Sequence, residues 1–419
     1  MDHFNYRDGI LHAEDLAVNE IIEQVDTPCY IYSRATLERH WHAFNDGFSQ
    51  YPHLVCFAVK ANSNLGVLSV MAKLGSGFDI VSGGELQRVI AAGGDPSKTV
   101  FSGVAKSEQE IAFALEQGIL SINIESSAEL ERIQSVAAAM NVVAPISVRV
   151  NPDVDAQTHP YISTGLEEAK FGIPMQNAVD VYQTAHAMPN IRVHGVACHI
   201  GSQITTTSPF VDALLRLIEL VKTLEGLGIE IKQLDLGGGL GIPYHDETPP
   251  SPAEYIQTLQ STLHDAEINI PISIEPGRAI AGNAGILVTK VEYLKANSSK
   301  RFAIVDAGMN DLMRPALYQA WHDIIPVVEA NDESPSEAAY DVVGPVCETT
   351  DILGKSRNLR LQADDLLAIR STGAYGFVMS SNYNTRPKPP EVLVDRSQWH
   401  LVRRRETTEE LFATESVCP

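Results

Sequence analysis

The sequence has no membrane-length hydrophobic run, no extended basic cluster and few cysteines. No apolar stretch reaches the length that spans a bilayer. The first fifteen residues, which include Asp2, Arg7 and Asp8, lack the apolar core of a signal peptide. The densest basic run, Arg403 to Arg405, has only three residues and is followed by glutamates. With 53 acidic against 31 basic residues, the formal charge is -22, so we expect neither a membrane nor a nucleic acid as a partner.

The five cysteines form no recognisable pattern. They show neither a C-x-x-C pair nor the spacing of a zinc site, so we expect no metal. Such cysteines are typical of reduced thiols in a cytosolic protein, and we predict a cytoplasmic location. The length of 419 residues predicts two domains.

From about residue 30 to residue 280, short β-rich segments alternate with helical patterns. The segment 126–140, for example, has Ser126 as a plausible N-cap and Glu129 at the capping-box position, and the segment 209–227 ends at Gly228. This alternation predicts a parallel sheet with right-handed crossovers. We expect its strands at 54–60, 77–81, 99–102, 120–125, 144–150, 191–199, 231–236 and 272–275. Eight strands are the number that closes a TIM barrel, and a doubly wound open sheet is the alternative.

The two flanks of this region complete the predicted architecture. A helical pattern at 34–50 precedes the first strand, whereas little helix follows the eighth, so the leading helix could cover the outer position beside the eighth strand. After residue 284 the pattern changes to strands separated by polar turns. We expect these strands at 287–294, 301–305, 341–346, 365–371, 377–379 and 400–404. The predicted fold class is α/β: a (β/α)8 barrel over 31–283, and a β-rich domain, a β-barrel or sandwich, from 1–30 plus 284–419.

Four of the predicted strands end in residues that carry chemistry. Lys60 ends the first strand, His199 ends the sixth with Ser202 three residues beyond, Gly237–Gly239 follows the seventh, and Glu275 ends the eighth. Each signal alone also fits a structural role: an ion-paired lysine, a packed histidine or a tight glycine turn. Together they supply an amine, an imidazole, a phosphate-sized glycine turn and a carboxylate, with Arg278 three residues beyond. Pyridoxal phosphate (PLP) needs this set, because it is held by a lysine, by donors to its phosphate and by a partner for its ring nitrogen.

Nine motifs also resemble a known family. They are FAVKAN at 57–62, GFDIVSGGEL at 77–86, RVNPDVDAQTHPYISTG at 149–165, KFGI at 170–173, HIGSQ at 199–203, DLGGGLGIPY at 235–244, EPGR at 275–278, GPVCETTD at 344–351 and GAYG at 373–376. Over essentially its whole length the chain resembles the barrel-type PLP enzymes that include alanine racemase and the basic amino acid decarboxylases. Among these it is most similar to the diaminopimelate decarboxylases.

The resemblance implies a role for each residue of the cofactor site. Lys60 would carry PLP, His199 would stack on its ring, and Glu275 would pair with the ring nitrogen. The phosphate would be held by Ser202, by the glycine turn and by Tyr375. The full set of cofactor-binding residues that the resemblance implies is Lys60, Asp79, His199, Ser202, Gly237, Gly238, Gly239, Glu275, Gly277, Arg278 and Tyr375.

The resemblance also implies the reaction. PLP-dependent decarboxylation at the D-centre of meso-2,6-diaminopimelate would give L-lysine and CO2, the last step of lysine biosynthesis. Cys347 would deliver the proton that replaces CO2, beside Lys60, His199 and Glu275 as catalytic residues. The far end of the substrate would be bound by Arg278, Arg314, Tyr318, Glu348 and Tyr375. In this family the cysteine segment comes from the neighbouring subunit, so the resemblance implies a homodimer with shared active sites.

Two alternatives remain at the level of sequence. One is a sibling decarboxylase that acts on ornithine, arginine or carboxynorspermidine. Such a substrate has no distal carboxylate to be bound, whereas Arg314 indicates a site that binds one. The other is a non-catalytic PLP-binding regulator, which the intact Lys60, Glu275 and Cys347 disfavour. The segment His159–Gly165 is a candidate lid, because it follows the fifth predicted strand at the same mouth.

Overall fold

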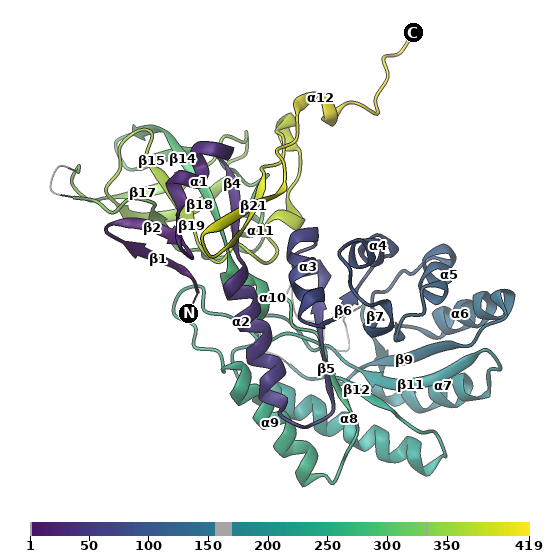
Figure 1. The fold of residues 1–419 in the computed structure, drawn as a ribbon. Helices are drawn as coiled ribbons and strands as arrows, with labels where there is room; N and C mark the ends of the chain where they lie inside the picture. Colours follow the sequence, from purple (N-terminus) through teal and green to yellow (C-terminus); the bar gives the residue numbers. More distant parts are fainter. Residues whose placement is uncertain (1, 156–169, 332–333) are drawn as a thin grey trace. The chain divides into compact units, whose positions relative to one another are not determined.

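The computed structural model describes residues 2–155, 170–331 and 334–419, which form two compact units (Figure 1). The barrel unit comprises Glu38–Pro243 and Glu247–Ala279. The β-rich unit comprises Met1–Leu37, Tyr244–Asp246 and Ile280–Pro419. In the described part of the chain, no helix combines the length and the apolarity needed to cross a membrane.

The barrel unit contains a closed ring of eight parallel strands. The order β5-β6-β7-β8-β9-β11-β12-β13 returns to β5, because β8 pairs with β9 and β13 pairs with β5. The strands are β5 (His53–Ala58), β6 (Gly77–Ile80), β7 (Thr99–Phe101), β8 (Ser121–Ile124), β9 (Ala144–Asn151), β11 (Ile191–Ala197), β12 (Gln233–Asp235) and β13 (Ile272–Ile274). A two-residue strand, β10 (Ile173–Pro174), also pairs with β9. The predicted TIM barrel is confirmed, and the open sheet is excluded.

Helices surround this ring, as Figure 1 shows. They are α2 (Arg34–Asn45), α3 (Leu65–Lys73), α4 (Gly83–Ala91), α5 (Glu108–Glu116), α6 (Ser127–Met140), α7 (Met175–Ala187), α8 (Ser208–Gly226) and α9 (Pro252–Asp265). Ser126 caps α6 as predicted, by accepting the amide of Glu129. The predicted capping box does not form, because the Glu129 carboxylate accepts the amide of Glu125 instead, at 2.7 Å.

The helix that precedes the first barrel strand packs on the last long helix of the barrel. Phe44 of α2 meets Tyr255 of α9 edge to face, with 6.4 Å between ring centroids. Just beyond α2, the carbonyl of Phe48 accepts a hydrogen bond from Gln260 of α9 at 2.9 Å. Directly after β13 the chain forms the short helix α10 (Arg278–Ala281) and then enters β14 (Gly285–Ala296) of the β-rich unit. The chain before β5 therefore supplies helical cover that the chain after β13 lacks.

The β-rich unit has two sheets. Its larger sheet runs β18-β17-β15-β14-β4-β20-β21, with β19 paired to β14 and β16 paired to β19, and β1–β3 form a small antiparallel sheet. The strands are β1 (Phe4–Arg7), β2 (Ile10–Ala13), β3 (Leu16–Ala17), β4 (Cys29–Ser33), β14 (Gly285–Ala296), β15 (Arg301–Val305), β16 (Ile324–Pro326), β17 (Ala338–Val343), β18 (Ile352–Leu359), β19 (Leu366–Ile369), β20 (Glu391–Asp395) and β21 (Gln398–Arg403). We predicted the barrel domain to begin at residue 31; β4 spans that position and pairs with β14 and β20.

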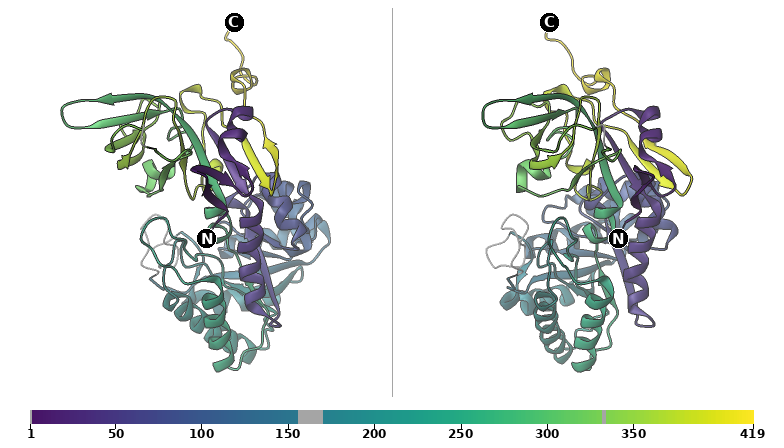
Figure 2. Two further views of the ribbon diagram at one scale, coloured as in Figure 1. Left: turned by 60° about the vertical axis from the view of Figure 1, so that its left-hand side comes forward. Right: turned by 90° about the vertical axis from the view of Figure 1, so that its left-hand side faces the viewer.

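The predictions for the β-rich unit were partly wrong. Residues 377–379, predicted as a strand, form a 3-10 turn. The strands β16, β18 and β20 were missed, and so was α1 (Val18–Val25). The short helices α11 (Arg314–Tyr318) and α12 (Thr408–Leu411) were also missed. Figure 2 shows the long hairpin of β14 and β15, whose strands pair antiparallel up to its end.

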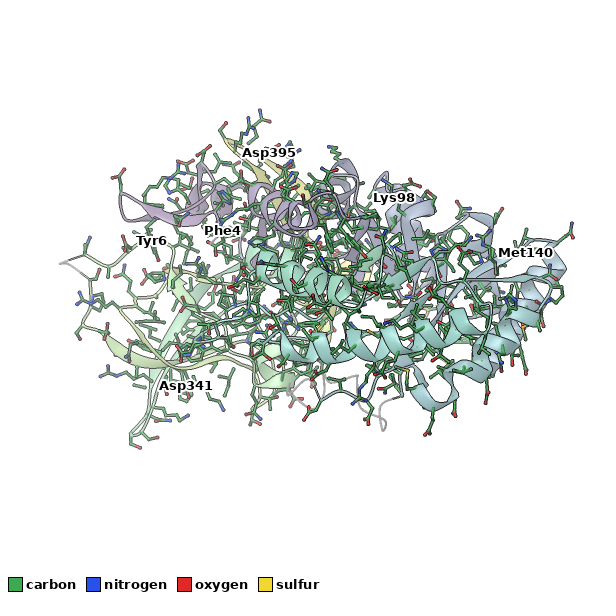
Figure 3. All side chains as sticks on the ribbon, turned by 90° about the horizontal axis from the view of Figure 1, so that it is seen from below. Phe4, Tyr6, Lys98, Met140, Asp341 and Asp395 are labelled. Carbon is green, nitrogen blue, oxygen red and sulfur yellow. The ribbon has the colours of Figure 1, made fainter. Side chains whose placement is uncertain are left out.

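One apolar core in the β-rich unit joins the N-terminal strands to the larger sheet. Phe4 of β1 is buried with residues of α1, β4, β14 and β20. Tyr6, two residues further along the same strand, donates its hydroxyl to the carbonyl of Pro326; Figure 3 labels both Phe4 and Tyr6. This packing explains why the first residues of the chain belong to the same unit as the last strands.

Candidate active site

The carboxyl ends of the barrel strands gather polar side chains that the sequence places far apart. In a parallel barrel these ends lie on one face, and the loops after them carry active sites. Lys60 lies in a single 3-10 turn, Val59–Ala61, because β5 ends at Ala58 and not at Lys60 as predicted. His199 lies two residues beyond β11, and Glu275 directly follows β13.

Lys60 is held by a carboxylate on the neighbouring strand. Its amine donates to Oδ2 of Asp79, which lies on β6 and is fully buried. The Lys60 side chain is one-third exposed, so it links the buried layer to the mouth of the barrel. The second oxygen of Asp79 is buried and has no hydrogen-bond partner among the described residues. A buried carboxylate is stable only when it is paired, and Lys60 supplies that pairing.

Asp235 and Glu275 form a buried carboxyl pair in the same layer. Their side chains are hydrogen-bonded to each other, and burial, reinforced by the neighbouring carboxylates, raises the pKa of Glu275 well above its ordinary value. Burial also raises the pKa of Asp235, against the hydrogen bonds that it accepts from the amide of Gly237 at 3.0 Å and from Asn123 at 3.1 Å. Two adjacent buried carboxyl groups cannot both ionise cheaply, so their surroundings favour the retention of a proton by the pair.

His199 is held as a neutral ring. Burial, together with the positive charges of Arg149 and Lys60, lowers its pKa well below the ordinary value. The amide N–H of Gly238 donates to His199 Nδ1 at 3.1 Å, so this nitrogen is an acceptor and the proton belongs on Nε2. The ring therefore presents an uncharged face and a single N–H donor.

The glycine turn after β12 is packed so closely that no side chain fits. A Cβ on Gly237 would lie 2.5 Å from the carbonyl oxygen of Cys198, and one on Gly239 would lie 2.5 Å from that of Gly201. A Cβ on Gly238 would collide with the carbonyl oxygen of Glu275. Gly237 and Gly239 also have positive φ values of 64° and 115°. The turn is thus packed against the backbone that follows β11 and the backbone that follows β13.

A second polar group lies beside this turn. Arg278, which begins α10 and is 7% exposed, donates from Nη2 to the hydroxyl of Ser202 at 3.1 Å. An arginine and a hydroxyl in contact form a good site for an anion, since both can donate to its oxygens.

The sequence analysis missed several residues of this layer. Asn123 of β8 donates to Asp235 and also to Ser102, at 3.2 Å. Arg149 of β9 donates to Glu125 at 2.8 Å. Each lies at or next to the carboxyl end of a predicted strand, so polar residues at strand ends were the signal that could have identified them. The predicted lid, His159–Gly165, lies outside the described residues.

The remaining predicted site residues belong to the β-rich unit. Arg314 and Tyr318 are the first and last residues of α11, and Arg314 is buried. Cys347 and Glu348 are exposed in the loop between β17 and β18. The amide of Cys347 donates to Asn384 at 3.2 Å, and Glu348 accepts the hydroxyl of Tyr383 at 2.6 Å.

Tyr375 lies in the stretch between β19 and β20 with a φ of 55°. A positive φ is uncommon for an aromatic residue and marks a backbone that its surroundings hold in place. The neighbouring glycines explain part of this constraint, because a Cβ on Gly376 would lie 2.9 Å from the Tyr30 ring.

The chain is similar to proteins of one family over its whole length. Residues 34–282 match the model of the pyridoxal-dependent decarboxylase, pyridoxal binding domain. The chain is 59% identical to diaminopimelate decarboxylase of Vibrio cholerae and 58% identical to that of Pseudomonas aeruginosa, each over 100% of both chains. The crystal structure of diaminopimelate decarboxylase from Helicobacter pylori complexed with L-lysine superimposes with a TM-score of 0.91, at 40% identity, over 95% of this chain and 98% of that one. On this evidence the chain belongs to the pyridoxal-dependent decarboxylases, and within them to the diaminopimelate decarboxylase family.

Proposed function

We propose that this chain catalyses the PLP-dependent decarboxylation of meso-2,6-diaminopimelate at its D-centre, which gives L-lysine and CO2. The observation that carries the proposal is the group formed by Lys60, His199 and the buried Asp235–Glu275 pair at one end of the barrel, in a chain of this family. The diaminopimelate decarboxylase of Helicobacter pylori was crystallised as a complex with L-lysine, which supports lysine as the product here.

The residues of the barrel unit fit the cofactor. Glu275 Oε1 is buried and has no hydrogen-bond partner among the described residues, although its surroundings favour a proton on the carboxyl pair. The pyridine nitrogen of PLP would be a suitable partner for Glu275 Oε1, because the nitrogen and the carboxyl group could share that proton. The neutral His199 ring offers a flat face for stacking, as the pyridine ring requires. Bound PLP supplies a ring that stabilises the electron pair left on carbon when CO2 departs.

The phosphate of the cofactor fits the glycine turn and the Ser202–Arg278 pair. The amides of Gly237 and Gly238 already donate to Asp235 and His199, whereas among the described residues no hydrogen bond engages the amide of Gly239. We therefore assign the phosphate to Gly239, Ser202 and Arg278 in the barrel unit, with Gly237 and Gly238 shaping the turn. Gly277 belongs to the same proposal, because a Cβ there would lie 2.8 Å from that of Ala61. Tyr375 would contribute from the β-rich unit.

Lys60 would attach the cofactor through its amine. An amine reacts only when it is neutral, and the Asp79 carboxylate that it contacts is placed to take up the proton that the amine releases. Asp79 also holds the amine in one direction, so Lys60 would be oriented toward the cofactor in advance.

The substrate would be recognised by residues of the β-rich unit together with Arg278. Arg314 would bind the distal carboxylate, and Glu348, with Tyr318 and Tyr375, would bind the distal ammonium. Binding of the distal carboxylate and ammonium would orient the scissile bond, although these groups take no part in the reaction. When that bond breaks, its electron pair stays on the substrate carbon, and Cys347 donates the proton that this carbon takes up. Solvent then returns a proton to the thiolate.

We further propose a homodimer in which Cys347 and Glu348 complete the active site of the neighbouring subunit. Both residues are exposed within their own unit, as groups offered to a partner must be. Mixing Lys60→Ala subunits with Cys347→Ala subunits tests this directly, since one of the two sites in a mixed dimer would be intact. Random exchange restores about one quarter of wild-type activity if sites are shared. No recovery, under conditions where exchange is demonstrated, would show that each subunit works alone.

A cytoplasmic location also remains our proposal. All five cysteines are unpaired thiols, three of them buried, which suits a reducing compartment.

The substrate is tested by supplying meso-diaminopimelate or ornithine to the purified enzyme with PLP. We expect equimolar CO2 and lysine from diaminopimelate and no CO2 from ornithine. Release of CO2 from ornithine but not from diaminopimelate would assign the chain to a sibling decarboxylase. Release from neither, with PLP bound, would make it a regulator.

A further inference from the structure

A buried histidine in the β-rich unit lies against the arginine to which we assign the substrate carboxylate. His322 lies between α11 and β16 and is fully buried. Its Nε2 lies 2.7 Å from Nη1 of Arg314. The motifs that identified the family did not include this residue.

The second ring nitrogen of His322 decides the direction of that hydrogen bond. Nδ1 lies 2.8 Å from the backbone carbonyl oxygen of Arg370, and a carbonyl oxygen can only accept. Nδ1 therefore carries the proton. Arg314 can only donate, so Nε2 must be the acceptor. Both neighbours thus require the same neutral tautomer of His322.

A second uncharged group covers the Arg314 guanidinium. Tyr244 contributes its ring face, with the guanidinium carbon 4.4 Å from the ring centroid, and the same ring meets His322 edge to face at 5.3 Å. Neither contact cancels the positive charge of Arg314, because imidazole and phenol are both neutral. The two rings thus hold the guanidinium in one direction without placing a negative charge beside it.

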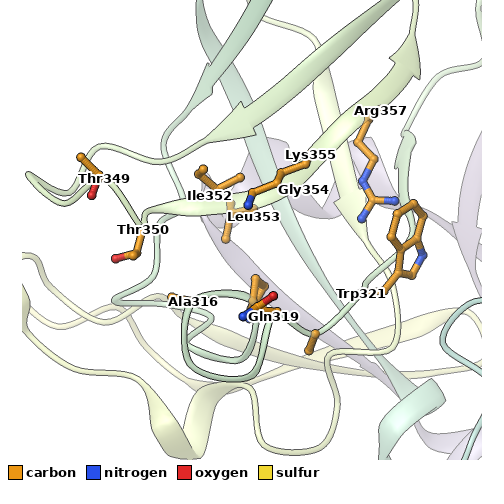
Figure 4. Close-up of a pocket in the computed structure, with 12 residues that line it drawn as sticks. Ala316, Gln319, Trp321, Thr349, Thr350, Ile352, Leu353, Gly354, Lys355 and Arg357 are labelled. Atoms are coloured by element: carbon orange, nitrogen blue, oxygen red, sulfur yellow. The ribbon is translucent and has the colours of Figure 1, made fainter.

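The backbone of His322 is fixed as well. Its carbonyl accepts a hydrogen bond from Nη2 of Arg357 at 2.8 Å, and Arg357 packs over the ring of Trp321, the residue before the histidine. Figure 4 shows Arg357 and Trp321 beside one another, at the side of a cavity of about 460 Å³ between α11 and β18. His322 is therefore held by side chain and main chain together, so it can impose a position on Arg314.

We propose that His322 is a positioning residue, which holds the Arg314 guanidinium in one orientation for the distal carboxylate of the substrate. This inference rests on the proposed function. An acidic residue in place of His322 would hold Arg314 equally well but would compete with the substrate, whereas a neutral acceptor does not. The selectivity for a substrate with a distal carboxylate would thus depend on a residue that does not touch the substrate.

Two variants separate the hydrogen bonds of His322. His322→Asn keeps an amide N–H near the position of Nδ1 and loses the acceptor toward Arg314. His322→Gln can return an acceptor to that position. We expect His322→Asn to raise the KM for meso-diaminopimelate about 10-fold, with a smaller change in kcat, and His322→Gln to recover part of this loss.

The decisive measurement compares two inhibitors of the holoenzyme. L-lysine carries the carboxylate that Arg314 would bind, and 1,5-diaminopentane lacks it. His322→Asn should weaken inhibition by L-lysine about 10-fold and leave that by 1,5-diaminopentane within about 2-fold. His12→Asn is the matched control, since the Nδ1 of His12 also faces a backbone carbonyl, that of Ile10 at 2.9 Å, in the same unit.

The outcomes distinguish this inference from the proposed function. If His322→Asn weakens inhibition by L-lysine and by 1,5-diaminopentane equally, His322 has only a structural role. If Arg314→Ala weakens L-lysine selectively but His322→Asn behaves like wild type, the positioning role is wrong and the clamp stands. If Arg314→Ala shows no such selectivity, the proposed clamp itself is wrong. Should His322→Asn fail to fold, Tyr244→Leu removes the other neutral contact and is expected to cause the same selective loss.

Discussion

The barrel unit and the β-rich unit hold their polar groups in different ways. In the barrel unit, Asp79, Asp235 and Glu275 come from different strands around one ring and contact groups on neighbouring strands. In the β-rich unit, Arg314 starts a one-turn helix, and Cys347 lies in an exposed loop. A regular repeat thus builds the site that we assign to the cofactor, whereas irregular segments supply the groups that we assign to the substrate. On this proposal the cofactor chemistry depends on the barrel fold, and the substrate specificity depends on loops.

The largest effect is expected from Lys60→Ala in the barrel unit. Loss of the amine should lower kcat by about 10³-fold or more and abolish the visible absorbance of enzyme-linked PLP. An absorbance spectrum of the purified variant with PLP checks this, and Lys98→Ala, in the same unit, is the control. An unchanged spectrum would remove Lys60 from the cofactor site.

Arg314→Ala in the β-rich unit should lower kcat/KM for meso-diaminopimelate by about 10- to 100-fold, because a charge-assisted hydrogen bond is lost. Its affinity for PLP should stay near that of wild type, as measured by titration of the apoenzyme. Arg301→Ala, which changes an exposed arginine of β15, is the control. Equal loss of PLP affinity and of kcat/KM would contradict our assignment of the cofactor to the barrel unit and of the substrate to the β-rich unit.

Asp235→Asn should have a smaller effect, about 10-fold on kcat. Removal of the Asp235 carboxylate takes away one cause of the raised pKa of Glu275, so Glu275 should lose its proton at lower pH. The limb of the pH–activity profile that reports this loss should move toward lower pH. A profile of kcat against pH checks the shift. A limb that does not move would show that Asp235 does not raise the pKa of Glu275.

Asp311→Asn should affect stability and leave activity least changed. Burial raises the pKa of Asp311 from 3.8 to about 7. Between about pH 4 and pH 7 the folded state therefore binds more protons than the unfolded state, so this group makes the free energy of unfolding fall as pH rises. Urea unfolding at several pH values should show that the free energy of unfolding falls less steeply with pH in the variant than in the wild type. Equal slopes for the two proteins would contradict the raised pKa.

Much of the barrel could be predicted from the sequence, because alternation of apolar strands and amphipathic helices is a strong local signal. Lys60, His199 and Glu275 follow from it as residues at strand ends. The contacts among them do not, because Asp235 and Asn123 are neighbours only in the closed barrel. In the β-rich unit, β16 and β18 were missed, since their short or polar-interrupted strands resemble loops. His322 could not be identified because its role lies in two hydrogen bonds, to Arg314 and to the distant backbone of Arg370.

The pairing of β4 with β14 also bears on how the chain folds during its synthesis. β4 lies before the barrel sequence, and its partners β14 and β20 lie after it. Topologically, the barrel is an insertion between two adjacent antiparallel strands, with Tyr32 opposite Gly285. β4 therefore leaves the ribosome before either of these partners and cannot pair with them until the whole barrel has been made. The barrel, whose strands pair mostly with the next ones along the chain, can fold first and bring the two halves of the other sheet together.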